Sequence, residues 1–550
     1  MPADLPRVKT CQTCATAKIR CLCSPDSPIC DRRLGLLERR VDELLGQSSQ
    51  GHSPPDGKTG DVIDKGILSL DDAAALLDSF RHCMMPHFPF VVLPMMATAG
   101  ELRESAPFLF LAILSVSATH DRALKRGLDE EMRAVLAERT VLKHNHADSL
   151  DTLQGLLVVL AWSQHELQQR SAPRHFSTYL YLALSLVVDR RLDKPIETWR
   201  RKARRMNIRE EAIKERPLKT VRAEQRAALG CSFLSSCSGI ITQERCLFPW
   251  TPELEASAVA LAEHPEYDSD QIILHLVRLQ HVLEEIDQVS SDHDSFAPSG
   301  CAFHHIFRSF TSRIQNYSSL LPPELTNNFL LATQFHTASL YLCQVSLFDR
   351  SKATTQLPVE MRSEILCQGL VAAKSSFASL ATTGVGFERH FSYSQWLQSG
   401  FNLIVSCKLA LMAVSDTTLR DHCPQVQTLC DALDMPGVLS MCIAFQDHHP
   451  AGSDPATGFD YKAWLKLIQE WFLRQYDGYV ARQGASAPAS STLVSSQTYL
   501  RIGDGSTGDL QQPLSSHSME WSSFGDLVTS NPLAEWMDLS MLSCGDTPGA

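Results

Sequence analysis

The N-terminal segment concentrates cysteines at spacings that suit a metal ion. Five thiols, Cys11, Cys14, Cys21, Cys23 and Cys30, lie close together among basic residues. Thiolates bind zinc tetrahedrally, and a Cys-x-x-Cys knuckle brings two thiolates onto one ion without strain. Because the segment has too few apolar residues for a hydrophobic core, its fold needs a cross-link such as a bound metal ion. We predict zinc as a cofactor; the alternative is scattered core thiols, because free cysteine is often buried.

The residues between these cysteines add a second signal. Six residues, including Lys18 and Arg20, separate Cys14 from Cys21, and Pro28 precedes Cys30. The stretch resembles the Zn₂Cys₆ binuclear cluster of fungal transcription regulators. The resemblance implies Cys11, Cys14, Cys21 and Cys30 as zinc ligands, with Cys23 as a substitute or a bystander. It also implies that Lys18 reads a CGG triplet in the major groove of DNA and that Arg20 contacts phosphate.

The cluster departs from the family pattern after Cys30. The family's fifth cysteine is expected at position 33, which is Arg33, and no sixth cysteine precedes the next helix. The first four cysteines alone can still complete one tetrahedral zinc site. Alternatively, the sequence lacks a short piece between Asp31 and Leu34. Both explanations stay open at this stage.

The elements around the cluster suggest how it is presented. Residues 1–33 form the predicted DNA-binding module. In residues 34–45, Leu34, Leu37, Val41 and Leu44 recur at three- and four-residue spacings among charged residues, which predicts a short coiled coil. In the resembled family this coiled coil makes a homodimer and sets the half-site spacing. Residues 46–65 are polar and rich in Gly, Ser and Pro, which predicts a flexible linker.

The body of the chain, residues 66–480, has helical periodicity. Residues 70–80, 150–162, 179–188 and 329–342 carry apolar side chains at i, i+3, i+4 and i+7, or all round. Alternating strand patterns are scarce. The fold class is therefore predicted as all-α: a small zinc-stapled N-terminal module, a short coiled coil, a large helical regulatory domain and a disordered acidic tail.

Four stretches of this body resemble the fungal-specific regulatory domain that follows many Zn₂Cys₆ clusters. They are residues 77–91, 106–113, 181–189 and 227–236. This version of the domain is common in regulators of secondary-metabolite gene clusters, which implies pathway-specific control by analogy.

Residues 481–550 are rich in Ser, Gly and Gln, a composition that cannot offset its ordering entropy by burial. Acidic residues there alternate with bulky apolar ones, which is typical of activation segments that recruit transcriptional coactivators. The candidate activation residues are Trp521, Phe524, Trp536, Met537 and Leu539. The alternative is an amphipathic helix that docks on the main domain.

A basic run, Arg200, Arg201, Lys202, Arg204 and Arg205, predicts a nuclear-import signal and hence a nuclear location. The alternative is a solvated helix surface, because acidic residues interleave with the basic residues that follow the run. These acidic residues are Glu210, Glu211, Glu215 and Glu224.

Composition narrows the function further. The formal net charge of −12 indicates that any contact with DNA is local, because non-specific affinity comes from Lys and Arg. No apolar run approaches the length that spans a bilayer, so we expect no membrane partner.

Other candidate sites are weak. The histidine pairs at 144/146, 304/305 and 448/449 lack an acidic or thiol ligand at metal-site spacing. The adjacent carboxylates Glu284 and Glu285 splay apart on a helix and do not face each other as an acid/base pair would.

We find no catalytic motif and predict that the protein is not an enzyme. The sequence thus favours a nuclear, zinc-dependent, sequence-specific transcription factor that binds CGG-type sites as a homodimer and activates RNA polymerase II genes of a secondary-metabolite cluster. The alternative is a DNA-binding-deficient coregulator that acts through protein–protein contacts. A third interpretation is a helical small-molecule receptor or enzyme, which would require a ligand pocket.

Overall fold

The computed structural model describes residues 60–119, 121–142, 149–162, 175–194, 217–243, 246–292, 300–348, 357–384, 386–446 and 461–486. In this part of the chain the regular structure is helical and no β-strand occurs, which confirms the all-α prediction for the body. The chain divides into two compact units, Met1–Gly66 and Ile67–Ala550. All of the helices described below belong to the second unit.

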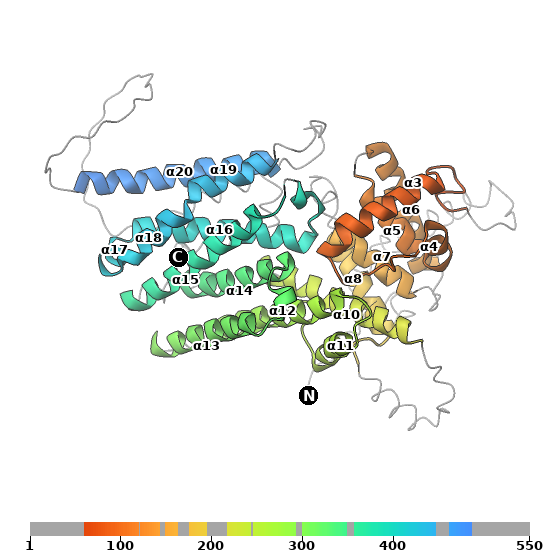
Figure 1. The fold of residues 1–550 in the computed structure, drawn as a ribbon, viewed down its shortest axis with the longest axis horizontal. Helices are drawn as coiled ribbons and strands as arrows, with labels where there is room; N and C mark the ends of the chain where they lie inside the picture. Colours follow the sequence, from red (N-terminus) through yellow and green to blue (C-terminus); the bar gives the residue numbers. More distant parts are fainter. Residues whose placement is uncertain are drawn as a thin grey trace, which may run out of the picture. The chain divides into compact units, whose positions relative to one another are not determined.

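The helices of this unit keep the labels of Figure 1 and follow one another along the chain. Their bounds are α3 (Leu70–Ser79), α4 (Ala99–Ser105), α5 (Pro107–Ser117), α6 (Arg122–Ala137), α7 (Ser149–Ala161), α8 (His175–Asp189), α10 (Leu218–Ile241), α11 (Pro252–Glu263), α12 (Ser269–Asp292), α13 (Gly300–Ser319), α14 (Phe329–Leu347), α15 (Val359–Ala381), α16 (Tyr393–Ser415), α17 (Thr417–His422), α18 (Pro424–Leu433), α19 (Met435–Gln446) and α20 (Tyr461–Ser486). Short π and 3₁₀ segments, Phe80–Met84 and Met85–His87, continue the chain directly after α3.

Local sequence explains where several helices begin. The Ser69 hydroxyl accepts a hydrogen bond from the Asp72 backbone N–H at the start of α3. Thr98 and Glu101 form a reciprocal capping box at the start of α4. Each device satisfies backbone donors that a helix leaves unpaired in its first turn.

Helix α5 obtains its cap from a distant part of the chain. Ala106, at its N-cap position, offers no side-chain hydrogen bond. Instead, the Asp151 carboxylate of α7 accepts hydrogen bonds from the backbone N–H groups of Phe108 (3.1 Å) and Leu109 (2.7 Å). A carboxylate is favourable here because the helix N-terminus carries partial positive charge. Packing of α5 on α7 therefore completes the start of α5.

The core is organised around α16. This helix contacts α7, α10, α14, α15, α17, α18, α19 and α20. Figure 1 shows α12, α14, α15 and α16 running alongside one another, and the same pairs are in contact. Most side chains of α16 are buried, including polar ones such as Gln395, Gln398 and Asn402. A helix that is buried all round must bring its polar groups to partners inside the protein.

Helix α10 joins the earlier helices to this group, because it contacts α7 and α8 as well as α11, α12 and α16. Two of its glycines are in its buried part. At one of them, Gly230, an added Cβ would lie 2.8 Å from Phe90 Cβ, so only glycine allows this close approach.

Two segments reach the length and mean hydropathy that could cross a membrane: Tyr393–Ser415 and Pro424–Gln446. The sequence analysis expected no such segment, because it considered only uninterrupted apolar runs. The first segment is α16, of which 83% is buried within the fold. The second is two helices, because Asp434 adopts a left-handed conformation (φ 47°) between α18 and α19. The apolar character of α16 therefore fits a core helix of a helical domain, whereas only 22% of the second segment is buried.

Candidate functional site: a buried polar seam

A line of hydrogen-bonded glutamines crosses the core of the helical unit. Gln398 Nε2 on α16 donates to Gln334 Oε1 on α14 at 2.6 Å, and Gln334 Nε2 donates to Gln280 Oε1 on α12 at 2.8 Å. Gln280 Nε2 then donates to Ser236 Oγ on α10 at 3.0 Å. All four side chains are 3% exposed or less. We call these four residues the glutamine seam.

The seam gives four helices one consistent set of hydrogen bonds. Each glutamine amide in the line donates through nitrogen, and Gln334 and Gln280 each also accept through oxygen. A buried amide without a partner costs about 1 to 3 kcal/mol, so other alignments of α10, α12, α14 and α16 are disfavoured. The seam therefore fixes how these helices are aligned.

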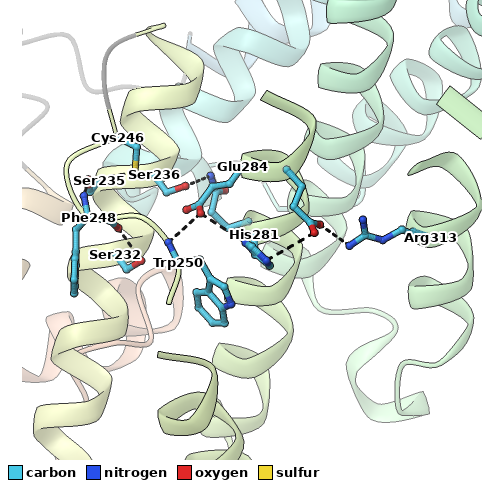
Figure 2. A network of polar contacts seen from close by, with 11 residues as sticks. Ser232, Ser235, Ser236, Cys246, Phe248, Trp250, His281, Glu284 and Arg313 are labelled. Atoms are coloured by element: carbon cyan, nitrogen blue, oxygen red, sulfur yellow. Dashed lines mark hydrogen bonds and ion pairs between the residues drawn. The ribbon is translucent and has the colours of Figure 1, made fainter. Parts of the chain in front are cut away.

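Figure 2 shows how the α10 end of the seam continues into the loop before α11. The Ser235 hydroxyl accepts hydrogen bonds from the backbone N–H groups of Leu247 (2.9 Å) and Phe248 (3.0 Å). The Ser232 hydroxyl donates to the Phe248 carbonyl at 3.1 Å. The Trp250 backbone N–H donates to Glu284 Oε2 on α12 at 3.0 Å. On α10, Ser232 and Ser235 therefore bind the loop, and Ser236, next to Ser235, binds Gln280 of the seam.

The outer edge of the same network is charged (Figure 2). The Trp250 ring stacks on His281 with 5.6 Å between centroids. Glu284 accepts from the Trp250 backbone N–H, and Glu285 pairs with Arg313 of α13 at 2.5 Å. Both carboxylates also lie beside one imidazole, since His281 Nδ1 is 3.7 Å from Glu284 and His281 Nε2 is 3.9 Å from Glu285. The expectation that the two carboxylates splay apart overlooked His281, which lies one turn earlier on α12 and reaches both.

The α16 end of the seam borders a small cavity. Its polar lining is His87, Gln334, Ser394, Gln395 and Gln398, and its apolar lining includes Phe88, Phe90, Phe233, Leu276 and Leu330. The space open to the centre of a water molecule is about 10 Å³, which is room for about one water. The cavity therefore suits a single small polar guest.

One donor in this lining lacks a partner. Gln395 is 1% exposed, and its Oε1 accepts from the Ser392 backbone N–H at 2.9 Å, which fixes the orientation of the amide. Its Nε2 has no hydrogen-bond partner within the described part of the chain. The cavity thus offers one amide N–H donor to a guest that carries an acceptor.

His87 also contacts this amide. Its Nδ1 lies 2.9 Å from Gln395 Oε1, which already accepts from Ser392, so Nδ1 carries the hydrogen. Burial lowers the pKa of His87 from 6.5 to about 4. The imidazole is therefore neutral at pH 7, and it brings no positive charge to the cavity.

Buried ion pairs flank the seam. Arg226 of α10 pairs with Asp270 at the start of α12, with Nε and Nη2 2.6 and 2.8 Å from its two carboxylate oxygens. Arg226 is 3% exposed and Asp270 is 0% exposed. Asp270 also accepts from the Glu266 and Tyr267 backbone N–H groups. The pair is thus fully hydrogen-bonded, as a buried pair must be.

A second buried pair corrects one sequence interpretation. Glu224, which the alternative interpretation of the basic run placed on a solvated helix surface, is buried and pairs with Arg190. Arg190 and Arg226, two basic residues on either side of the run at 200–205, thus form ion pairs within the fold. Helical periodicity alone did not show this, because the partner of Glu224 lies on a different segment.

The histidine pair on α13 has a partner that sequence spacing could not show. His304 Nε2 lies 2.9 Å from Glu364 on α15, and the Arg308 guanidinium binds both oxygens of the same carboxylate at 2.9 and 3.0 Å. Within the described residues, no group of three potential metal ligands occurs.

The site residues predicted from the sequence lie outside the described residues. These are the cysteines and basic residues of positions 11–30, the coiled-coil positions 34–44, the basic run 200–205 and the tail residues 521–539. The structure therefore does not test their roles. The sequence analysis overlooked the glutamine seam, although glutamines within strongly apolar helices, such as Gln334 and Gln398, were a usable signal.

Comparison with known proteins agrees with a regulatory helical body. Residues 38–366 match the family model described as the WAR1 C-terminal domain. The transcription factor himD of Aspergillus japonicus is 35% identical over 517 residues, covering 84% of this chain and 84% of himD. The transcription factor opdL of Penicillium oxalicum is 24% identical over 552 residues, covering 87% of this chain and 91% of opdL.

A shorter similarity extends to the transcription factor pbcR of Emericella nidulans, which is 25% identical over 249 residues, or 43% of this chain and 33% of pbcR. No solved structure matches the chain significantly.

Proposed function

From the premise that the chain belongs to the WAR1 C-terminal domain family of fungal transcription factors, we propose that it binds DNA in a sequence-specific manner and activates RNA polymerase II genes. The observation that carries the proposal is the similarity to himD, which extends over most of both chains. It is supported by the N-terminal cysteines and by Lys18, which match the resembled Zn₂Cys₆ pattern.

In this proposal each part of the chain has one task. Cys11, Cys14, Cys21 and Cys30 hold zinc, Lys18 reads the CGG triplet, and Arg20 contacts phosphate. The coiled coil of residues 34–45 makes the homodimer, and residues 481–550 recruit coactivators. The basic run of residues 200–205 directs import into the nucleus. The genes controlled belong to a secondary-metabolite cluster.

In this proposal the helical unit is the regulatory domain of the chain. Its seam and buried ion pairs specify one packing of α10, α12, α14 and α16.

The decisive experiment is a titration of the full chain against a duplex with paired CGG triplets, first with zinc and then with a chelator. We expect zinc-dependent binding that prefers CGG over a scrambled duplex. Lys18→Ala should weaken binding to CGG by about 5- to 150-fold, equivalent to about 1 to 3 kcal/mol. Lys65→Ala, outside the cysteine cluster, is the matched control and should bind like the parent.

The absence of two cysteines favours a second candidate, a coregulator that no longer binds DNA. In that case the titration shows no zinc-dependent preference, while residues 485–550 fused to an unrelated DNA-binding domain still activate a reporter. Changing Trp521 and Trp536 to alanine should weaken the fusion. A silent fusion would exclude the activation role in both candidates.

A further inference from the structure

The cavity beside the glutamine seam lies where five parts of the chain meet. The segment His87–Phe90, which follows the short helices after α3, contributes four residues, and α10, α12, α14 and α16 supply the rest of the lining. Every polar side chain of the lining is 6% exposed or less. The cavity is therefore an interior site that the four seam helices share with a more N-terminal segment.

Size and polarity limit what this site can hold. The space open to the centre of a water molecule is about 10 Å³, which is too small for a metabolite. The lining contains no Asp, Glu, Lys or Arg, so an ion would lose its hydration without gaining a counter-charge. An apolar guest would leave the buried Gln395 Nε2 without an acceptor. A neutral guest with one heavy atom, able both to accept and to donate, meets all three limits, and water is such a guest.

The lining also offers acceptors for the two hydrogens of a water molecule. Gln334 Oε1 accepts from Gln398 Nε2 at 2.6 Å, and a carbonyl oxygen has a second lone pair. The Ser394 hydroxyl lies 3.0 Å from the Ser392 hydroxyl, and its oxygen likewise has two lone pairs. With Gln395 Nε2 as the donor, one water can thus make three hydrogen bonds, the usual number for a buried water.

We propose that this cavity is a binding site for one internal water molecule, which accepts from Gln395 Nε2 and donates to Gln334 Oε1 and to the Ser394 hydroxyl. The water joins Gln395 to the glutamine seam. Because His87 donates to Gln395 Oε1 at 2.9 Å, hydrogen bonds then run without a break from His87 to Ser236 on α10. The segment after α3 is thereby attached to the seam helices by polar contacts. The water site does not depend on DNA binding.

The test is a crystal structure of the full-length, unmodified protein at a resolution that shows ordered waters. We expect a single compact peak of electron density about 2.5 to 3.2 Å from Gln395 Nε2, Gln334 Oε1 and Ser394 Oγ. A cavity without density would overturn the proposal, because the site would then be dry. Density that extends over several atoms would also overturn it, because the site would then hold a larger ligand.

A variant tests the donor. In Gln395→Met a side chain of similar length replaces the amide, so the peak should be lost. The matched control is Gln427→Met, at an exposed hydrogen bond on α18, which should keep the peak. A peak that persists unchanged in Gln395→Met would contradict the assignment of Gln395 as the donor. Gln395 also accepts from Ser392 and His87, so we expect this variant to be less stable; the unmodified protein decides the proposal even if the variant does not fold.

A measurement in solution gives an independent readout. Relaxation dispersion of water oxygen-17 detects waters that stay inside a protein far longer than bulk water exchanges. The unmodified protein and Gln427→Met should hold one more such water than Gln395→Met. Equal numbers in all three proteins would overturn the proposal without reference to a crystal.

Discussion

The middle glutamine of the seam is the most informative single residue. Gln334→Leu leaves Gln398 Nε2 and Gln280 Oε1 without partners inside the core. We expect the free energy of unfolding to fall by about 2 to 6 kcal/mol, because each of the two buried groups left without a partner costs about 1 to 3 kcal/mol. Urea unfolding measures this difference. Gln427→Leu, at an exposed hydrogen bond on α18, is the control and should stay within about 0.5 kcal/mol.

A buried and an exposed arginine–carboxylate pair allow the effect of burial on stability to be compared at equal charge. Arg226→Met removes the partner of Asp270, which is 0% exposed, and should cost about 3 to 5 kcal/mol of stability. Arg308→Met removes an equally well-formed contact to Glu364 at the surface and should leave the unfolding midpoint indistinguishable from the parent. Equal losses in the two variants would contradict the view that desolvation dominates the effect.

At the scale of elements, substitution of two helix glycines by alanine should change stability in opposite directions. Gly230→Ala on α10 places a Cβ 2.8 Å from Phe90 Cβ, and relief of this overlap should cost about 1 to 3 kcal/mol. Gly100→Ala on α4 meets nothing within 4 Å and should stabilise the protein by about 0.4 to 1 kcal/mol, because it restricts the unfolded chain. Thermal unfolding of both variants checks the two signs; a stabilised Gly230→Ala would show that α10 can move away from Phe90.

At the scale of the whole molecule, buried His87 and half-buried His336 should make stability depend on pH. Burial lowers the pKa of both His87 and His336 from 6.5 to about 4. The unfolded chain therefore binds more protons than the folded chain between these values. Their contribution to stability is fully present above pH 6.5 and is lost as the pH falls towards 4.

Urea unfolding at pH 7.5, 6 and 5 measures this dependence. We expect the midpoint to fall across the series in the parent protein and to fall less in a His87→Phe, His336→Phe double variant. A parallel fall in both proteins would assign the effect to other groups.

The sequence by itself determined features that depend on near neighbours in the chain. Helical periodicity in residues 329–342 predicted α14, and Leu70 to Phe80 predicted α3 to within one residue of its end. The all-α class followed in the same way, because a helix is stabilised by contacts at i+3 and i+4 that the sequence displays directly. The family resemblance in residues 77–236 was likewise carried by local motifs.

Only the tertiary structure decided which distant residues meet. Asp151 caps α5 because α7 packs beside it, Glu224 is buried because Arg190 reaches it, and Gln334 bridges two other helices. Periodicity identifies the face that a helix buries but not the helix that covers it, since burial is non-directional whereas hydrogen bonds and ion pairs require particular partners at particular distances.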